Sequence, residues 1–204
     1  MLVELNTSNP QPRQINRIVQ TLERGGIIVY PTDTTYALGC DIENRKAAQQ
    51  IKAIKQMPKG KLLSLVCPDL KAVSQYGYVG NQAYKLLKHC LPGPYTFILK
   101  ATKLVPKVMM TKRKTIGVRI TSNIIAQTIV ENLGRPMVTA SVRISGEEIM
   151  SDPELIYDRL GHQLDFVIDA GMLFPEPSSV IDLSEEPPII VRKGKGDISF
   201  IAEV

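Results

Sequence analysis

The chain has little of several residue types that commonly define a function. Its 204 residues include no tryptophan, three cysteines and two histidines. Cys40, Cys67 and Cys90 are odd in number and far apart, which argues against a disulfide framework and favours reduced thiols in the core of a cytoplasmic protein. Two histidines are too few for a histidine-rich metal site, so we expect no metal held by the protein itself.

Long apolar runs are also missing. A membrane-spanning helix needs roughly 20 predominantly apolar residues, and the longest runs here are only a few residues long. The first five residues have neither the basic flank nor the apolar stretch of a signal peptide. Because 44% of the 204 residues are hydrophobic, the chain can bury a full core. We expect a single domain spanning residues 1–204, with no membrane contact.

Acidic residues are scarce in the middle of the chain. Between Arg45 and Arg119 there are 16 lysines and arginines but one acid, Asp69, and the remainder holds 9 basic and 19 acidic residues. The middle therefore carries +15 and the remainder −10. Such a block suits a polyanion, either ATP, RNA or both, although a charge run alone is more often a solvated surface. Few aromatic residues argue against stacking on single strands, which leaves structured RNA as the nucleic acid to consider.

Apolar spacing predicts alternating helices and strands without repeats or linkers. A first amphipathic helix ends at Gly25-Gly26, a second is capped by Asn44, and a third runs from Ser122 to Gly134. Further helices are expected near 69–76, near 81–90 and from a start signature at 151–154. Strands are expected at 62–67, 95–101, 115–120, 137–141, 165–170, 178–183 and 189–193. The last strands follow one another without helices, which predicts a mixed sheet. Lys112, Arg113 and Lys114 lie between two of these strands and form the best candidate for a mobile, RNA-contacting loop.

The segment from residue 25 to residue 40 is the most informative. Two glycines end a helix, Ile27–Tyr30 make a buried strand, and a proline and three threonines follow at once. Open α/β sheets bind ligands at the carboxyl ends of their strands, so these hydroxyls are candidate ligand contacts. The alternative is a strand-to-helix connection whose hydroxyls only hold the turn.

Two common phosphate-binding motifs are absent: there is no G-x-x-x-x-G-K-[ST], and no G-x-G-x-x-G follows a strand. Any bound ATP would therefore be held by side-chain cations and hydroxyls. Lys55 and Lys61, at a helix-to-loop junction, are more typical of surface residues. Arg119 and Arg192 end apolar strands, where a charge must face water, a partner or a ligand.

Six segments stand in an order that resembles a known family. They read YPTDTTYALG from residue 30, PGPYTFIL from 92, GVR from 117, PMVTAS from 136, PSSVID from 177 and VRKG from 191. Over about residues 12–195 the chain resembles the YrdC-like family of threonylcarbamoyl-AMP synthases, and it is most similar to the short YciO-type branch. The resemblance implies an α/β fold in which a twisted mixed sheet, flanked by helices, surrounds a large basic cavity.

The resemblance also implies a reaction of tRNA modification. Threonine, bicarbonate and ATP would give threonylcarbamoyl-AMP and pyrophosphate, with Mg²⁺ bound through the nucleotide and the product passed to a tRNA-modifying protein. Catalysis by positioning and charge neutralisation would need no general-base histidine. By position, the residues that resemble the family's threonine contacts are Thr34, Arg119, Thr139, Ser178 and Ser179. Those that resemble its nucleotide contacts are Lys55, Lys61, Ser141 and Arg192.

Three positions depart from the family pattern. The family signature of Lys-x-Arg and Ser-x-Asn is replaced by Lys55-Gln56-Met57 and Ser141-Val142-Arg143, and Val66 stands where a polar residue near the substrate is expected. Met57 cannot donate to phosphate, and losing one charge-assisted contact costs about 1.5–3 kcal/mol. Arg143 either reaches a phosphate in its place or occupies the nucleotide site.

These departures leave three functions open. The first is a threonylcarbamoyl-AMP synthase with weakened activity. The second is a protein of the same family that binds double-stranded RNA or tRNA and has little synthase activity. The third is a related enzyme that uses another acyl or carbamoyl donor.

Overall fold

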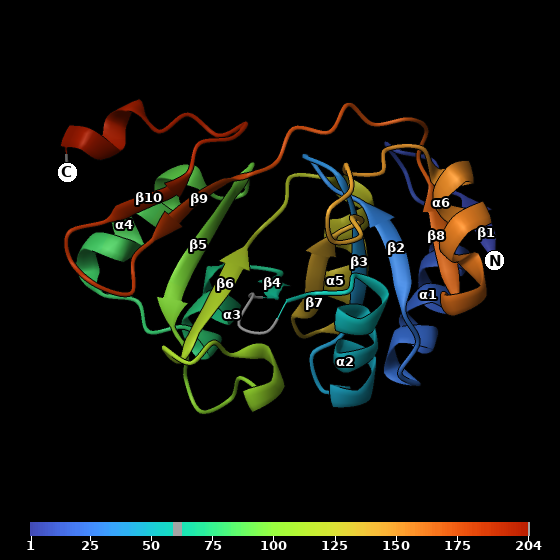
Figure 1. Ribbon diagram of the computed structural model, residues 1–204, viewed down its shortest axis with the longest axis horizontal. Helices are drawn as coiled ribbons and strands as arrows, with labels where there is room; N and C mark the ends of the chain where they lie inside the picture. Colours follow the sequence, from blue (N-terminus) through green and yellow to red (C-terminus); the bar gives the residue numbers. More distant parts are fainter. Residues whose placement is uncertain (59–62, 204) are drawn as a thin grey trace.

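The computed structural model describes residues 1–58 and 63–203 (Figure 1). Its strands are β1 (Leu2–Glu4), β2 (Ile28–Pro31), β3 (Tyr36–Asp41), β4 (Ser64–Val66), β5 (Tyr95–Lys100), β6 (Thr115–Arg119), β7 (Met137–Ser141), β8 (Phe166–Asp169), β9 (Ser179–Asp182) and β10 (Ile189–Arg192). The α-helices are α1 (Pro12–Glu23), α2 (Arg45–Ile54), α3 (Leu70–Tyr76), α4 (Asn81–Cys90), α5 (Ile124–Leu133) and α6 (Pro153–Leu160), and short 3-10 helices are η1 (Lys107–Met109), η2 (Gly161–Gln163) and η3 (Ser199–Glu203).

One twisted, open sheet contains all ten of these strands, in the order β1-β8-β2-β3-β7-β4-β6-β5-β9-β10. The sheet contains both parallel pairs, such as β4 with β6, and antiparallel pairs, such as β5 with β6. The mixed sheet predicted from the late strands is therefore confirmed. Within the described parts of the chain, no helix combines the length and the apolar character needed to cross a membrane.

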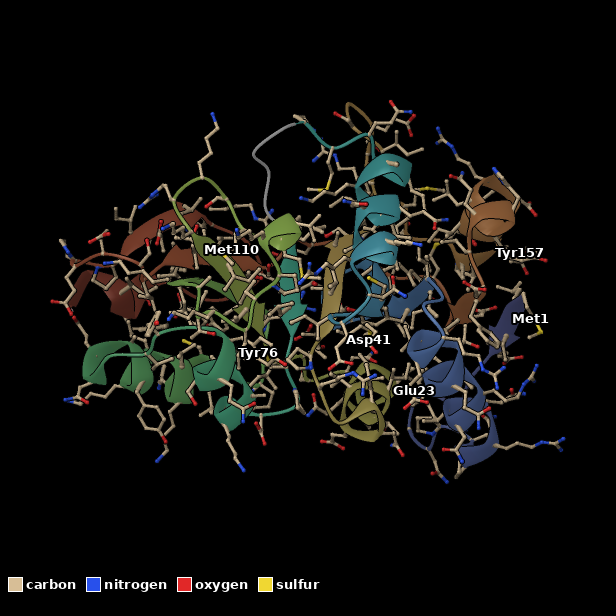
Figure 2. All side chains as sticks on the ribbon, turned by 90° about the horizontal axis from the view of Figure 1, so that it is seen from below. Met1, Glu23, Asp41, Tyr76, Met110 and Tyr157 are labelled. Atoms are coloured by element: carbon tan, nitrogen blue, oxygen red, sulfur yellow. The ribbon has the colours of Figure 1, made fainter. Side chains whose placement is uncertain are left out.

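Two apolar clusters form the core, one on each side of the sheet. Residues of α2 and α6 belong to the larger cluster, and residues of α1 and α5 belong to the other. Seen along the strands, α2 and α6 lie on one side of the sheet and α1 and α5 on the other (Figure 2). The three cysteines are buried and unbonded, as expected of core thiols.

The chain between β2 and β3 differs from the strand-to-helix connection considered above. After β2 it turns within residues 32–35 and returns as β3, antiparallel to β2, so the element is a hairpin. The Thr32 hydroxyl donates to the carbonyl of Thr35 (2.6 Å) and lies 3.0 Å from the Thr34 hydroxyl. The Thr32 side chain thus holds the turn, which leaves the other hydroxyls of this loop for other contacts.

Helix starts follow the capping chemistry that the sequence predicts, with one correction. Asn44 caps α2 by accepting a hydrogen bond from the Ala47 N–H (2.9 Å). The cap of the third predicted helix, α5, lies one residue later than expected, because Asn123 rather than Ser122 accepts a hydrogen bond from the Ala126 N–H (3.1 Å) in the first turn. It ends as predicted at Gly134, whose φ of +70° favours glycine.

Replacing Asn123 with alanine should lower the free energy of unfolding by about 1 kcal/mol, because α5 loses its capping acceptor. Urea unfolding followed by circular dichroism measures this. Asn132→Ala, in the same helix, is the matched control, since the Asn132 side chain is exposed and does not cap the helix. Equal losses in the two variants would show that the cap contributes nothing.

Candidate active site

A cavity of about 480 Å³ lies over the middle of the sheet. Its lining comes from β3, β7, β4, β6, β5, β9 and β10, from the end of α2 and from the loop that follows β7. A second cavity, of about 650 Å³, is lined mainly by apolar residues near α3 and α5. We assign the candidate site to the first cavity, because the predicted cations and hydroxyls gather there and not in the second.

Small side chains create this hollow. Ser64 pairs with Thr139 on one neighbouring strand and with Gly117 on the other. Paired residues of a pleated sheet lie on the same face, so these three form a floor of small residues. A Cβ atom on Gly117 would lie 2.4 Å from the Ser64 hydroxyl oxygen. Two residues further along the same face, Val66 and Met137 belong to the core cluster of α1 and α5, so the cavity opens beside those helices.

The cavity walls carry positive charge. Four basic residues line the cavity, and none of its described lining residues is acidic; the four are Lys55, Arg119, Arg143 and Arg192. Arg192 donates from Nε to the Ser178 carbonyl (2.9 Å) and from a terminal nitrogen to the Ser178 hydroxyl (3.2 Å). Burial first, and the nearby Arg119 charge second, lower the pKa of Arg192, but an arginine remains charged in a protein. The arrangement therefore favours an anionic ligand.

Arg119 ends β6 and is only 7% exposed. It forms an ion pair with the carboxylate of Asp33 and donates to the Thr34 hydroxyl (3.2 Å). Its Nε–H is buried and has no acceptor among the described residues. A buried donor without a partner costs free energy. Arg119 lines the cavity, and a carboxylate that reached its guanidinium would gain a charge-assisted hydrogen bond.

A buried tyrosine, Tyr30, orients the hydroxyl of Thr139. The Tyr30 hydroxyl donates to the Thr139 hydroxyl oxygen (2.6 Å). Burial raises the pKa of Tyr30 to about 12, despite the opposing effect of this hydrogen bond, so the phenol keeps its proton. Because Thr139 accepts from Tyr30, its own hydroxyl proton can be donated to a ligand.

Replacing Tyr30 with phenylalanine should lower the free energy of unfolding by about 1 kcal/mol, since the buried hydrogen bond is lost. If the cavity binds threonine, as the family resemblance implies, threonine affinity should fall in the same variant, because the Thr139 hydroxyl is then free to rotate away from the cavity. Differential scanning calorimetry and a threonine titration measure the two effects. Tyr36→Phe is the control: Tyr36 is also buried, but its hydroxyl bonds to the backbone of Ala170 and Gly171 outside the cavity, so only stability should change.

The predicted site residues separate into two groups. Those that line the cavity are Lys55, Arg119, Thr139, Ser141, Ser178 and Arg192, together with the altered positions Met57 and Arg143. Thr34 reaches the site through Arg119. Ser179 is fully buried, and its hydroxyl donates to the Gly196 carbonyl (2.5 Å) and accepts from the Gly194 N–H (3.0 Å), so it holds the C-terminal segment. Lys61 lies outside the described residues.

Two further sets of residues singled out in the sequence lie outside the cavity lining. Val66 is fully buried in the core cluster of α1 and α5 and does not line the cavity. In the basic loop, Lys112, Arg113 and Lys114 are exposed but lie outside the cavity lining. Arg113 is additionally tethered, because it forms a 3.4 Å ion pair with Asp182 of β9.

Both altered signature positions line the cavity. Met57 also packs against the larger core cluster, whereas Arg143 donates from Nε to the Glu147 carbonyl (2.6 Å). The Glu147 carboxylate in turn forms a 2.7 Å ion pair with Arg159 of α6. Lys55 donates to the carbonyls of Ser141 and Arg143, so the end of α2 and this loop are held together.

Sequence reasoning missed Asp33, Tyr30, Ser64 and Gly117 as parts of the site. Tyr30 and Asp33 lie within the recognised loop, but their partners are far away in the chain. Gly117 has no side chain, and Ser64 has only a short hydroxyl side chain outside the recognised segments; their signal is a small residue at the cavity face of a strand whose other residues are mostly large and apolar. That signal can be recognised only once the strand register is known.

Comparisons with known proteins show the family and the fold. The family model named Sua5_yciO_yrdC, described as telomere recombination, matches residues 20–194. The chain is 48% identical to the uncharacterized protein YciO of Escherichia coli strain K12 over 196 residues, 95% of each chain. The crystal structure of E. coli YciO superposes with a TM-score of 0.94 at 47% identity, covering 98% of each chain.

Relatives named as enzymes are more distant. A threonylcarbamoyl-AMP synthase of Vibrio vulnificus is 27% identical over 157 residues, which covers 76% of this chain and 84% of that protein. The crystal structure of P. abyssi Sua5 complexed with L-threonine has a TM-score of 0.89 at 25% identity, and the match covers 95% of this chain and 57% of that one.

Proposed function

The chain belongs to the Sua5, YciO and YrdC family, and from that premise we propose that it is a threonylcarbamoyl-AMP synthase that serves tRNA threonylcarbamoyladenosine modification. The observation that carries the proposal is a single basic cavity that unites Arg119, Thr139 and Ser178 with Lys55, Ser141 and Arg192. Named synthases and a threonine-bound structure among the relatives support the substrate.

In the proposed reaction, the threonine amine and bicarbonate form a carbamate with loss of water. A carbamate oxygen then attacks the α-phosphorus of ATP, and pyrophosphate leaves. Arg119 binds the threonine carboxylate, and the hydroxyls of Thr139 and Ser178 bind its remaining polar groups. Catalysis is by orientation and charge neutralisation, which suits a site whose lining contains cations and hydroxyls but no described acid or histidine.

The nucleotide phosphates are assigned to the remaining cations, Lys55, Arg192 and Arg143. Mg²⁺ neutralises phosphate charge when bound. Because the described lining residues include no carboxylate, this chain would receive the ion through the phosphates of ATP. The proposed partners are therefore threonine, bicarbonate and Mg²⁺-ATP, followed by a tRNA-modifying protein that accepts the labile product.

Product analysis tests the proposal. The purified chain is incubated with Mg²⁺-ATP, threonine and ¹³C-bicarbonate, quenched and examined by mass spectrometry for ¹³C-labelled threonylcarbamoyl-AMP. Arg135→Ala is the matched control variant, because Arg135 pairs with Asp41 away from the cavity; it should form product, whereas Arg119→Ala should not. Absence of labelled product with the unsubstituted chain would contradict the proposal.

Met57→Arg should strengthen ATP binding by roughly tenfold, because it adds a charge-assisted phosphate contact. The measurement is a calorimetric ATP titration. The control is Met172→Arg, at an exposed methionine outside the cavity. Met109 would not serve, because it is buried in the core. No gain over that control would mean that Arg143 already fills the phosphate position.

A second candidate function is binding of double-stranded RNA or tRNA. The observation that favours it is the exposed basic segment with Lys112 and Lys114 within the +15 central block. RNA held through many phosphates should lose affinity steeply as salt rises, whereas ATP in a compact cavity should lose less. Duplex RNA titrations at several salt concentrations distinguish the two; a flat salt dependence would contradict RNA binding through this segment.

A further inference from the structure

Asp33 is the counter-charge of Arg119, one of three arginines that line the cavity. The Arg119 and Asp33 side chains are 9% and 10% exposed, and they form an ion pair. By contrast, the hydrogen bonds of Arg192 go to the Ser178 carbonyl and hydroxyl, and Arg143 donates to the Glu147 carbonyl. The cavity is therefore uneven in charge: a carboxylate pairs with Arg119, whereas the hydrogen bonds of Arg192 and Arg143 go to neutral acceptors.

Several donors fix the Asp33 carboxylate in this position. One oxygen accepts from the Thr121 hydroxyl (2.9 Å), and the other accepts from the hydroxyl (3.3 Å) and the N–H (3.4 Å) of Ser122. The Asp33 carbonyl accepts from the Lys195 ammonium (2.7 Å). Asp33 does not itself line the cavity, so it acts on a ligand through Arg119 and through its charge, as a positioning residue.

We propose that Asp33 determines the ligand charge accepted beside Arg119: it selects a net-neutral zwitterion, an amino acid, over a simple carboxylate anion. With Asp33 charged, the pair offers donors to a carboxylate without an excess positive charge that would repel an ammonium group. With Asp33 neutralised, the excess charge of Arg119 attracts any carboxylate and repels the ammonium. The inference rests on the proposed function, because it concerns the threonine end of the same site.

The test compares threonine with 3-hydroxybutyrate, which is threonine without its ammonium group. Calorimetry gives both dissociation constants for the unsubstituted chain and for Asp33→Asn, which removes the charge but keeps the shape. The preference for threonine over 3-hydroxybutyrate should fall by about tenfold in Asp33→Asn, a size expected for one partly screened charge at short range. A ratio of two affinities is insensitive to general destabilisation.

Asp41→Asn is the matched control, because Asp41 forms a similar buried ion pair with Arg135 outside the cavity. It should lower stability and leave the ratio unchanged. Asp33→Glu, which restores the charge, should recover the preference. The reciprocal variant, Arg119→Gln, leaves the Asp33 charge unbalanced. It should shift the preference from threonine toward threoninol, a cation that lacks the carboxylate. This variant provides the test if Asp33→Asn does not fold.

The outcomes separate the two hypotheses. If threonine binds but Asp33→Asn keeps the original ratio, the role of Asp33 is overturned and the proposed function stands. If the unsubstituted chain binds neither threonine nor 3-hydroxybutyrate, both are overturned. An equal fall in the ratio for Asp33→Asn and Asp41→Asn would also overturn the role, since charge near Arg119 would then not be the cause.

Discussion

Replacing Arg119 with alanine should abolish measurable threonine binding, with a loss of at least a hundredfold. Arg119 lines the cavity, and its buried Nε–H has no acceptor among the described residues. A charge-assisted contact to the threonine carboxylate accounts for about 1.5–3 kcal/mol, and the lost guanidinium also leaves the Asp33 charge to repel that carboxylate. Threonine calorimetry measures the effect.

The fold should survive this substitution, because Asp33 keeps its hydrogen bonds from Thr121 and Ser122. Arg135→Ala is the control for stability: it also leaves a buried aspartate, Asp41, without its ion-pair partner. That variant should lose stability but bind threonine normally. Unchanged threonine affinity in a folded Arg119→Ala variant would contradict the assignment of Arg119 to the threonine carboxylate.

Replacing Arg192 with alanine should lower ATP affinity by roughly ten- to a hundredfold, the effect of one charge-assisted phosphate contact. Arg192 ends β10 and is oriented by two hydrogen bonds to Ser178, so its guanidinium is held at the cavity wall. Its neighbours there are neutral groups and another cation, which leaves its charge available to an anion. Threonine affinity should fall less than ATP affinity, because the variant removes only a hydrogen bond that orients the Ser178 hydroxyl.

Separate titrations with ATP and with threonine measure the two affinities. Arg113→Ala is the matched control, since Arg113 is exposed and lies outside the cavity lining. It should leave both affinities unchanged. Equal losses of ATP affinity in the two variants would indicate a general effect of net charge and would contradict a phosphate contact at Arg192.

Regular elements could be predicted well because their signals are local. Asn44 and Gly134 mark a helix start and a helix end by chemistry that needs no tertiary contact. The strand β3 was not predicted, because Ala37, Gly39 and Asp41 have low strand propensity and interrupt its run of large apolar residues. The strand β1 was missed for a different reason, since it has only three residues.

The candidate site could be predicted only in part. The charged ends of β6 and β10 were visible, because arginine at the end of an apolar strand needs a polar surrounding. The partner of Arg119 was not, since Asp33 is 86 positions away and no spacing rule joins them. Val66 was placed near the substrate because the family resemblance implies a polar residue at this position, but in the structure it is buried in the core cluster of α1 and α5.

The central claim is tested most directly by pyrophosphate release from Mg²⁺-ATP, measured with threonine and bicarbonate present together, singly and absent. The account predicts release that requires both, since pyrophosphate can leave only when the carbamate of threonine attacks the α-phosphorus. Release that needs neither compound, or no release under any condition, would contradict it.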